Sequence, residues 1–336
     1  MLRVGIIGAG EISKSHADAY RALGSKVKVV AVADKDQSKA AELARGLGAQ
    51  VLSDAEELLQ MELDVVDICL PTFLHEEFVT AAAGYGKHVF CEKPIALSLE
   101  AADKMIAATK KAGVKFMVGQ CIRFWPEYVA VRERLAKGDL GAVKVVTAGR
   151  IASAPNWSWD NWILKPDLSG GAVIDLHIHD VDFVNSLIPR SAETISAVGS
   201  KSRRGALDHI STLLDYGDGV VASIEGNWLV PDSYPFTMAL KVVCAEGTIE
   251  FVSRGIDVGN RDESEVNVVV YKQGQTPEVV RIPERKDAYL AEIEYFVDCV
   301  LADRDPAIVT AQDARDSLAL VLAAKQSQLE GKSIQV

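Results

Sequence analysis

The chain has 336 residues, of which 49% are hydrophobic and 25% charged, a composition typical of soluble globular proteins. Its 36 lysines and arginines against 47 aspartates and glutamates give a net charge of −11, which argues against nucleic acid or an anionic membrane as a partner. A chain of this length usually folds as two domains.

The cysteines and apolar runs bear on the cellular compartment. The apolar run that ends at Ile7 is too short for a signal peptide, and no run approaches the length of a membrane span. The scattered cysteines are odd in number and form no CxxC pair, so we expect reduced thiols in a reducing compartment. We therefore expect a cytoplasmic protein. The cysteines are Cys69, Cys91, Cys121, Cys244 and Cys299.

The first third of the chain alternates short β-branched runs with amphipathic stretches, the pattern of repeated βα units. Near-continuous apolar strands between helices predict an α/β domain with a doubly wound parallel sheet, covered on both faces. The predicted strands are Leu2–Ile7, Val27–Ala33, Val65–Leu70, Val89–Cys91 and Val114–Gly119. The predicted helices are Glu11–Leu23, Ser38–Leu47, His75–Tyr85 and Leu99–Ala112.

The pattern changes after Pro126. From Ile195 to Ile282 we predict successive longer strands in a mostly antiparallel sheet, because turn sequences separate the apolar runs. The turns are Asp215–Gly219, Ala245–Gly247 and Gln273-Gly274. The other predicted elements are a helix at Glu127–Lys137, a strand at Val143–Ala148, a helix after Gly170-Gly171, and two final helices at Ala288–Leu301 and Ala311–Leu329.

A glycine-rich turn follows the first strand and opens the first helix, with the sequence Gly8-Ala9-Gly10-Glu11-Ile12-Ser13. The glycines allow a tight turn and the close approach of a pyrophosphate, and the helix N-terminus offers amide donors. The third glycine position is occupied by Ser13, which is small enough for contact between helix and strand. A glycine turn without a ligand is the alternative. The βαβ setting favours a dinucleotide, with Gly8, Gly10, Glu11 and Ile12 as candidate contacts.

Asp34 lies at the end of the second predicted strand. A carboxylate there can accept hydrogen bonds from both ribose hydroxyls, and its charge would repel a 2′-phosphate. We therefore expect NAD, with NADP as the less favoured cofactor. The neighbouring Lys35 is a further candidate contact that works against this preference.

Pro71, Thr72 and His75 follow the next strand and are candidate cofactor contacts. Two alternatives stay open for them. Thr72 can instead cap the following helix, and His75 points either to the cofactor or to solvent.

Glu92-Lys93-Pro94 ends the fifth predicted strand. In open α/β sheets, ligands bind beyond the carboxyl ends of the strands, where Glu92 and Lys93 lie. The proline fixes the backbone, in a cis or a trans peptide, and holds the lysine in one direction. Beside a cationic nicotinamide ring, Lys93 is a candidate for proton exchange. The alternative is a surface pair of Glu92 and Lys93, which carries little energy.

The segment from Gly170 to Asp180 admits two interpretations. As a strand, it would place Asp175, His177 and His179 on one face and suggest a metal site. As a helix, it would place only Asp175 and His179 on one face. Apolar residues continue at helical spacing toward Pro189, which favours the helix and an Asp–His pair suited to alcohol oxidation. We expect no metal. A helix with one buried, hydrogen-bonded histidine is the structural alternative.

Three tryptophans, Trp157, Trp159 and Trp162, crowd the loop before that helix, interleaved with amides and carboxylates. Aromatic faces beside polar groups suit a polyhydroxylated ligand, so Trp157 and Trp162 are candidate substrate contacts. Loop packing or a subunit contact is the alternative for each of them.

Taken in order, these residues resemble the Gfo/Idh/MocA family, named for glucose–fructose oxidoreductase, inositol dehydrogenase and a rhizopine-catabolism protein. The likeness covers almost the whole chain. It is carried by Gly5-Ile6-Ile7-Gly8-Ala9-Gly10, Asp34, Pro71-Thr72 with His75, Gly86-Lys87-His88-Val89-Phe90-Cys91-Glu92-Lys93-Pro94, Arg123-Phe124 with Pro126, Gly170-Gly171 with Asp175, His179 and Asp180, and the tail Ser333-Ile334-Gln335-Val336.

The resemblance implies an N-terminal Rossmann domain over 1–122 and a C-terminal α/β domain over 123–336, with the last helix able to pack back on the first domain. It implies an open-faced sheet that assembles the protein as a homodimer or homotetramer.

The resemblance also implies a catalytic set of Lys93, Asp175 and His179. In this set His179 accepts a proton, while Lys93 and Asp175 orient the hydroxyl and tune charge. Arg123 would approach the cofactor and Trp162 the substrate. His177 departs from the family, in which a small residue is common at this position. Its imidazole either reshapes the pocket or faces away.

These inferences lead to a first hypothesis: an NAD-dependent dehydrogenase of a small polyhydroxylated substrate such as a sugar, an inositol or a related polyol. Two alternatives remain. One is elimination or glycoside cleavage with an internally recycled NAD, and the other is a non-catalytic regulator that binds the dinucleotide.

Overall fold

The computed structural model describes residues 1–255, 266–282 and 285–336, which form two compact units. The first unit comprises Met1–Phe124, Trp157–Trp162 and Lys286–Arg315, and the second comprises the described residues of the remaining stretches. The segment that returns to the first unit contains the whole of helix α10 (Ala288–Leu301), whereas most of the last helix, α11 (Ala311–Glu330), belongs to the second.

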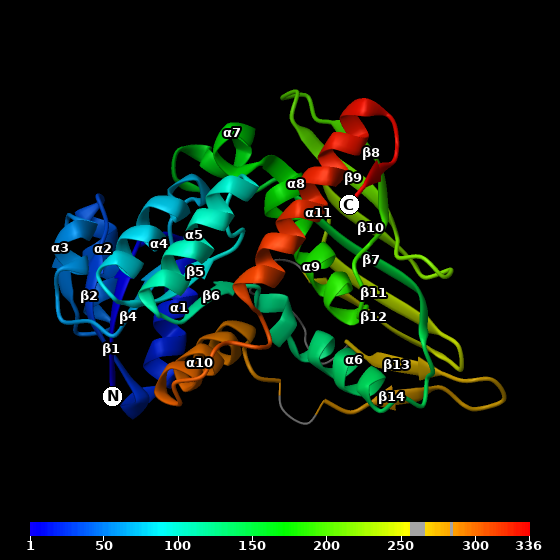
Figure 1. Ribbon diagram of the computed structural model, residues 1–336, viewed down its shortest axis with the longest axis horizontal. Coiled ribbons are helices and arrows are strands. Elements are labelled where there is room, and N and C mark those ends of the chain that lie inside the picture. Colours follow the sequence, from blue (N-terminus) through cyan, green and yellow to red (C-terminus); the bar gives the residue numbers. More distant parts are fainter. Residues whose placement is uncertain (256–265, 283–284) are drawn as a thin grey trace. The chain divides into compact units, whose positions relative to one another are not determined.

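The first unit is built on six parallel strands in the order β3-β2-β1-β4-β5-β6. This is the order of a Rossmann fold, as the resemblance implied. These strands belong to the blue-to-cyan part of the ribbon in Figure 1. Strand β3 and the short helix α3 were not predicted. The strands are β1 (Leu2–Ile7), β2 (Val27–Ala33), β3 (Gln50–Leu52), β4 (Val65–Ile68), β5 (His88–Glu92) and β6 (Phe116–Gly119).

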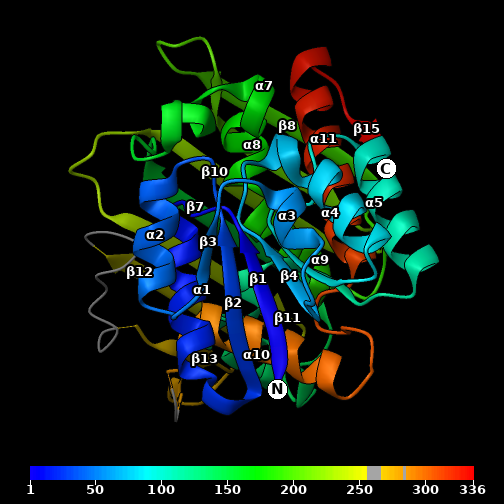
Figure 2. The ribbon, with the colours of Figure 1, turned by 90° about the vertical axis from the view of Figure 1, so that its left-hand side faces the viewer.

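Helices cover both faces of this sheet. Figure 2 shows α1 and α2 on one side of the strands and α4 and α5 on the other. They are α1 (Glu11–Ala22), α2 (Gln37–Arg45), α3 (Ala55–Leu59), α4 (His75–Gly84) and α5 (Leu99–Ala112), with 3₁₀ turns η1 (Gly24–Lys26), η2 (Thr72–Leu74) and η3 (Cys121–Phe124).

Helix α10 completes the core of the first unit although it comes late in the chain. Ile293, Phe296 and Val297 of α10 belong to the same buried cluster as Tyr20 of α1 and Phe90 of β5. The rings of Phe90 and Phe296 have their centroids 5.5 Å apart. Each such fully buried side chain stabilises the fold by about 1.5–3 kcal/mol.

The second unit contains a nine-stranded sheet in the order β14-β13-β12-β11-β7-β10-β9-β8-β15. Its described pairs are antiparallel except for β7 and β10, which confirms the predicted antiparallel character. The strands are β7 (Val143–Ser153), β8 (Thr194–Lys201), β9 (Leu207–Asp215), β10 (Val221–Val230), β11 (Phe236–Cys244), β12 (Thr248–Gly255), β13 (Val268–Tyr271), β14 (Glu278–Val280) and β15 (Ile334–Gln335).

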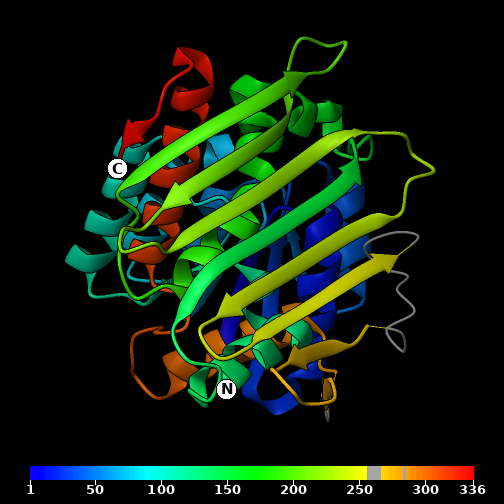
Figure 3. The ribbon, with the colours of Figure 1, turned by 90° about the vertical axis from the view of Figure 1, so that its right-hand side faces the viewer.

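One face of this sheet carries helices, and Figure 3 looks onto the other face. Strand residues alternate between the faces, so that Val198, Leu213 and Val252 remain at least half exposed. The helices of this unit are α6 (Pro126–Ala136), α7 (Pro166–Ser169), α8 (Gly171–Asp175), α9 (Ile178–Leu187) and most of α11. The 3₁₀ turn η4 (Trp159–Leu164) begins in the first unit and ends in the second. Among all the helices described, none has the length and apolar character needed to cross a bilayer.

Candidate functional site

The glycine turn between β1 and α1 is shaped by two glycines with different constraints. Gly8 has φ +101°, and a Cβ atom there would collide with the carbonyl oxygen of Cys69 at the end of β4. At Gly10, a Cβ atom would meet no atom within 4 Å. The hydroxyl of Ser13 donates to the carbonyl oxygen of Gly10 at 2.6 Å. The turn therefore leaves open space at Gly10, where a phosphate could approach the N-terminus of α1.

Asp34 joins the end of β2 to the glycine turn. Its Oδ2 accepts a hydrogen bond from the backbone of Ala9 at 2.7 Å, and its Oδ1 accepts one from the backbone of Asp36 at 2.7 Å. A carboxylate offers about four lone-pair sites, so both oxygens can still accept ribose hydroxyls. Lys35 and Glu11 are exposed, and Ile12 is half-buried.

Thr72 does not cap a helix. The residue before α4 is Leu74, without a side-chain cap, and Thr72 instead begins the 3₁₀ turn η2 after Pro71. The hydroxyl of Thr72 is buried and has no hydrogen-bond partner among the described residues. A buried hydroxyl without a partner calls for an explanation, and a ligand bound beyond the carboxyl end of β4 would supply one.

His75 is fully buried and faces neither solvent nor open space. Its Nε2 lies 2.8 Å from the carbonyl oxygen of Leu70, and its Nδ1 lies 2.8 Å from that of Pro94. A neutral ring donates one of these bonds, and an imidazolium would donate both. His75 therefore ties the loop after β4 to the loop after β5, and its contact with a cofactor remains a prediction.

Lys93 follows β5, and the Lys93–Pro94 peptide is cis, one of the two forms considered for it. The backbone nitrogen of Lys93 donates to Oε2 of Glu92 at 3.1 Å. The other oxygen of Glu92 lies 3.0 Å from Nε2 of His16. A Cβ atom at Gly119 would come within 3.0 Å of that oxygen. The side chain of Glu92 thus points inward, rather than forming a surface pair with Lys93.

His16 sits at the centre of a buried polar network that sequence analysis missed. Its Nδ1 lies 2.9 Å from Oδ2 of Asp67 and 3.3 Å from Sγ of Cys69. Burial alone would lower the pKa of His16, but Asp67 and Cys69 outweigh it and raise that pKa well above its usual range. The charged residue Asp67 within the apolar strand Val65-Val66-Asp67-Ile68 was the available signal.

Two groups in this network have the spacing of metal ligands: His16 with Asp67 and Cys69, and His16 with Glu92 and Glu292. Both nitrogens of His16 already have hydrogen-bonding partners in these groups, Asp67 and Cys69 at Nδ1 and Glu92 at Nε2. We therefore interpret both groups as parts of a buried hydrogen-bond network.

Asp175 and His179 lie in the second unit, on two helices rather than the one predicted. Asp175 ends α8 and His179 is the second residue of α9, with Leu176 and His177 between them. Both site residues are half-buried. The helical interpretation is confirmed in kind, and the strand that would have placed Asp175, His177 and His179 on one face is excluded.

Helix α9 is held through the residues that flank His179. Oδ2 of Asp180 accepts a hydrogen bond from Nε of Arg150 on β7 at 2.8 Å, and its Oδ1 lies 3.3 Å from the hydroxyl of Tyr128 on α6. Oδ1 of Asp182 accepts one from Ser317 on α11 at 2.9 Å. All of these side chains are buried. The position of His179 is therefore set by buried polar contacts to three other elements.

The other predicted contact residues lie in the first unit. Of the two tryptophans that are candidate substrate contacts, Trp157 has a side chain that is 62% exposed, as a stacking platform requires, and Trp162 is half-buried. The neighbouring Trp159, which was not a predicted contact, is also exposed. Arg123 is buried and donates to the carbonyl oxygen of Ile308 at 2.8 Å, with Asp313 at 3.3 Å. These contacts define where Arg123 lies, and its approach to a cofactor remains a prediction.

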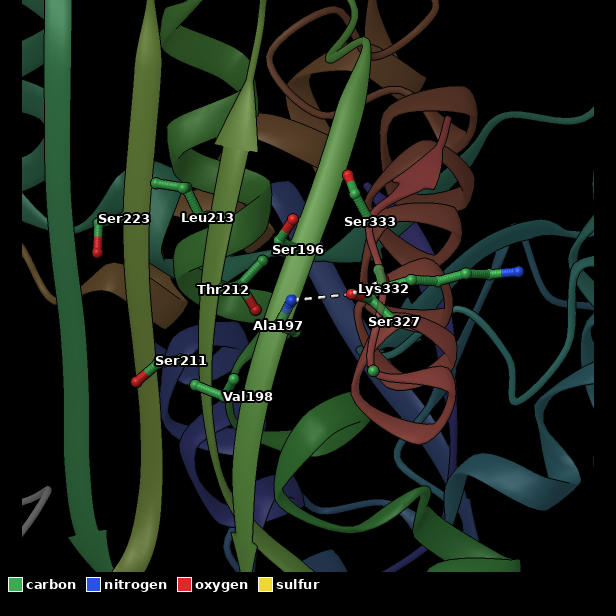
Figure 4. Close-up of a pocket in the computed structure, with 11 residues that line it drawn as sticks. Ser196, Ala197, Val198, Ser211, Thr212, Leu213, Ser223, Ser327, Lys332 and Ser333 are labelled. Atoms are coloured by element: carbon green, nitrogen blue, oxygen red, sulfur yellow. Dashed lines mark hydrogen bonds between the residues drawn. The ribbon is translucent and has the colours of Figure 1, made fainter.

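A separate hollow of about 380 Å³ lies on the sheet of the second unit beside the end of α11 (Figure 4). Serine and threonine side chains line much of it, and the backbone of Ala197 donates to Oγ of Ser327 at 3.0 Å. None of its lining residues was predicted to be a site residue.

Comparisons with known proteins agree with the fold. Residues 2–120 match the model of an oxidoreductase family with an NAD-binding Rossmann fold, and residues 128–250 match that of the GFO/IDH/MocA C-terminal domain. The chain is 28% identical to myo-inositol 2-dehydrogenase of Thermotoga maritima, over 100% of this chain and 98% of the relative. It is 28% identical to scyllo-inositol 2-dehydrogenase (NAD(+)) of Bacillus subtilis, over 100% and 96%.

A solved structure supports the same relationship. The crystal structure of a probable dehydrogenase from Thermotoga maritima superimposes with a TM-score of 0.82 at 28% identity, covering 99% of this chain and 98% of that one.

Proposed function

The chain belongs to the Gfo/Idh/MocA family of oxidoreductases, and on that premise we propose that it is an NAD-dependent dehydrogenase of an inositol, a sugar or a related polyol. The observation that carries the proposal is the open glycine turn with the carboxylate of Asp34 bonded to its backbone at Ala9, and the buried, unsatisfied hydroxyl of Thr72 after β4 adds to it. These groups offer what a dinucleotide requires: a free hydroxyl, space for phosphates and an acceptor for ribose hydroxyls.

The proposed cofactor contacts divide by the part of the dinucleotide that they suit. Gly8 and Gly10 leave the backbone open for the pyrophosphate at the N-terminus of α1. Asp34 accepts the ribose hydroxyls and disfavours a 2′-phosphate, which supports NAD over NADP. Thr72 and Lys93 follow β4 and β5, beyond the carboxyl ends of the strands, where nicotinamide sites of this fold lie.

The proposed chemistry follows from the residue types. NAD supplies the hydride acceptor when it is bound. His179 accepts the proton of the substrate hydroxyl, because a neutral imidazole is a base suited to neutral pH. Asp175 and Lys93 orient the hydroxyl and balance the charge that develops on its oxygen. The exposed faces of the tryptophans stack on the C–H surface of the polyol.

The test is turnover on a panel of inositols, aldoses and sugar acids, followed by NADH absorbance with NAD and NADP in parallel. Lys93→Ala and His179→Ala should each bind NAD normally and lose about 10²–10⁴-fold in kcat, the usual contribution of a positioned acid or base. Lys87→Ala is the matched control, since Lys87 donates to the carbonyl oxygen of Met61 and has no role in the proposal.

Other outcomes would favour the other hypotheses. Normal kcat in both variants would contradict the assigned roles. Copurified NAD with turnover and no net NADH would support internal recycling of the cofactor, and binding of polyol without turnover would support a regulator.

We also propose that the protein assembles as a homodimer or homotetramer through the open face of the nine-stranded sheet. Val198, Leu213 and Val252 expose apolar side chains on this face, and exposed apolar patches on soluble proteins commonly mark interaction surfaces. Light scattering on the wild type and on Leu213→Glu tests the proposal. A monomeric wild type would contradict it.

A further inference from the structure

The link between α8 and α9 carries a histidine to which the proposed function gives no role. His177 lies between Asp175 and His179, and its side chain is fully buried. Its backbone nitrogen lies 2.9 Å from the carbonyl oxygen of Ala172, five residues earlier, a wider turn than that of an α-helix. Turns closed by such a bond occur where helices end, and this one sets the path of the chain from α8 to α9.

Gly226 on β10 makes the room for the imidazole of His177. A Cβ atom at position 226 would lie 2.8 Å from Cβ of His177 and 3.1 Å from its Nδ1, too close for either group to stay in place. Gly226 pairs with Ile210 of β9 on one side and Arg150 of β7 on the other, so the strand is held from both edges. A methyl group here would therefore displace the ring of His177.

The neighbouring strand supplies the polar contact of the ring. Nε2 of His177 lies 2.9 Å from the buried hydroxyl of Thr212 on β9. Burial, with a smaller contribution from His209, lowers the pKa of His177 to about 3, so the ring is neutral at physiological pH.

The other nitrogen of the ring is left unsatisfied. Nδ1 of His177 has no hydrogen-bond partner among the described residues. A buried polar atom without a partner destabilises a fold, so an apolar side chain would fill this space at less cost. Packing alone does not account for a histidine here.

We propose that His177 is a positioning residue for the reaction. Its ring, seated in the notch left by Gly226 and bonded to Thr212, fixes the wide turn between α8 and α9. This turn is the backbone segment that connects Asp175 to His179. Its conformation therefore sets the direction in which both side chains leave the backbone. This inference rests on the proposed function, in which Asp175 and His179 act on the substrate.

The first test compares two glycines of the same sheet. Gly226→Ala should lower kcat by roughly tenfold or more, since a displacement of about 1 Å can cost about 10²-fold in rate. Its KM for NAD should not change, because the cofactor contacts lie in the other unit. Gly149→Ala on β7 is the control: its Cβ would meet nothing closer than 3.9 Å, and its kcat should match that of the wild type.

The second test asks whether the effect passes through the histidine. His177→Ala should also lower kcat, because the ring and its contact with Thr212 are lost. In a His177→Gly background, which lacks both the ring and Cβ, adding Gly226→Ala should cause no further loss, because the methyl group no longer meets a side-chain atom at position 177. Thr212→Val removes the hydroxyl and should lower kcat, whereas Thr212→Ser keeps the hydroxyl and should restore most of it. The two Thr212 variants test the same contact if Gly226→Ala does not fold.

The outcomes separate this inference from the proposed function. Turnover by the wild type, together with unchanged kcat in Gly226→Ala and Thr212→Val, would overturn the positioning role and leave the function standing. No turnover by the wild type on any polyol would count against the function alone. Imidazole NMR then decides the inference, since the chain has six histidines. Gly226→Ala should shift the signals of His177 and His179, Gly149→Ala should shift neither, and an unmoved His179 would overturn the proposal.

Discussion

His16 and Glu92 are joined by a hydrogen bond of 3.0 Å inside the first unit, with His16 fully buried. The same carboxylate accepts the backbone N–H of Lys93 through its other oxygen. The histidine is therefore connected, through one side chain, to the backbone of the residue proposed to orient the substrate. Glu92 therefore contributes both to the stability of the fold and to the position of Lys93.

We predict that Glu92→Gln destabilises the protein by about 3–5 kcal/mol, the usual cost of removing one partner of a buried charged pair. The pair of Lys104 and Glu76 has the same separation of 3.0 Å but is exposed, so Glu76→Gln should cost less than about 1 kcal/mol. Guanidinium unfolding of the three proteins measures both effects. Similar losses in the two variants would mean that burial of the His16–Glu92 pair has no energetic consequence.

Glu292 makes stability depend on pH. Its carboxyl is fully buried, and neither oxygen has a partner among the described residues. Burial, with Glu92 adding to it, raises the pKa of Glu292 well above its usual range. The folded protein thus keeps a proton that the unfolded chain releases above about pH 4.3. Stability linked to this group is complete below that pH and is lost as the pH rises toward the folded pKa.

We therefore predict that Glu292→Gln flattens the decline in stability between pH 5 and pH 8, by up to about 1.4 kcal/mol per pH unit. Urea unfolding at both pH values measures it. Glu294→Gln, on the same helix but paired with Lys26, is the control. If wild type and Glu292→Gln lost stability in parallel, the proton would not be held as described.

The two glycines of the turn should respond in opposite ways to alanine. Gly10→Ala should fold with a stability within about 1 kcal/mol of the wild type, because its Cβ enters open space, but it should lose dinucleotide affinity. Gly8→Ala should lose stability, because the residue has φ +101° and no room beside Cys69. Thermal unfolding and NAD titration separate the effects. Full NAD affinity in Gly10→Ala would contradict the proposed phosphate position.

Asp34 should decide between the two cofactors. Asp34→Ala should raise the KM for NAD by about 10–100-fold, the value of hydrogen bonds to a charged group, and should raise the KM for NADP much less. Asp36→Ala is the control, since Asp36 accepts from Ser38 and Lys39 to cap α2 and should leave both KM values unchanged. Steady-state kinetics with both cofactors provides the measurement. If the ratio of the KM for NAD to the KM for NADP were the same in Asp34→Ala as in the wild type, Asp34 would have no part in cofactor selection.

Much of the first unit could be predicted from the sequence, because apolar runs and turn signals alternate there. Strands β1 and β2 and helix α5 have the predicted bounds. Strand β3 and helix α3 have three and five residues, too short to show a periodicity. Strand β7 continues five residues past its predicted end at Ala148 to Ser153.

The details of the site depended on contacts that a linear pattern does not contain. The turn at His177 looked like continuous helix, because the notch at Gly226 lies on a strand distant in sequence. Asp67 could have been noticed as a charge in an apolar strand, but its partner His16 could not have been. Thr72 is a residue type that often caps helices. Only the structure shows that it begins a 3₁₀ turn instead, and that its hydroxyl has no hydrogen-bond partner among the described residues.

Because α10 fills the core beside Tyr20 and Phe90, the first unit cannot complete its folding while its own strands leave the ribosome. Its six strands emerge early, yet the surface that Phe296 covers stays exposed to water until almost the whole polypeptide has been translated. A nascent chain arrested before Ala288 should therefore expose an apolar surface that binds chaperones. The recombinant fragment Met1–Phe124 should aggregate unless a peptide spanning Lys286–Arg315 is added.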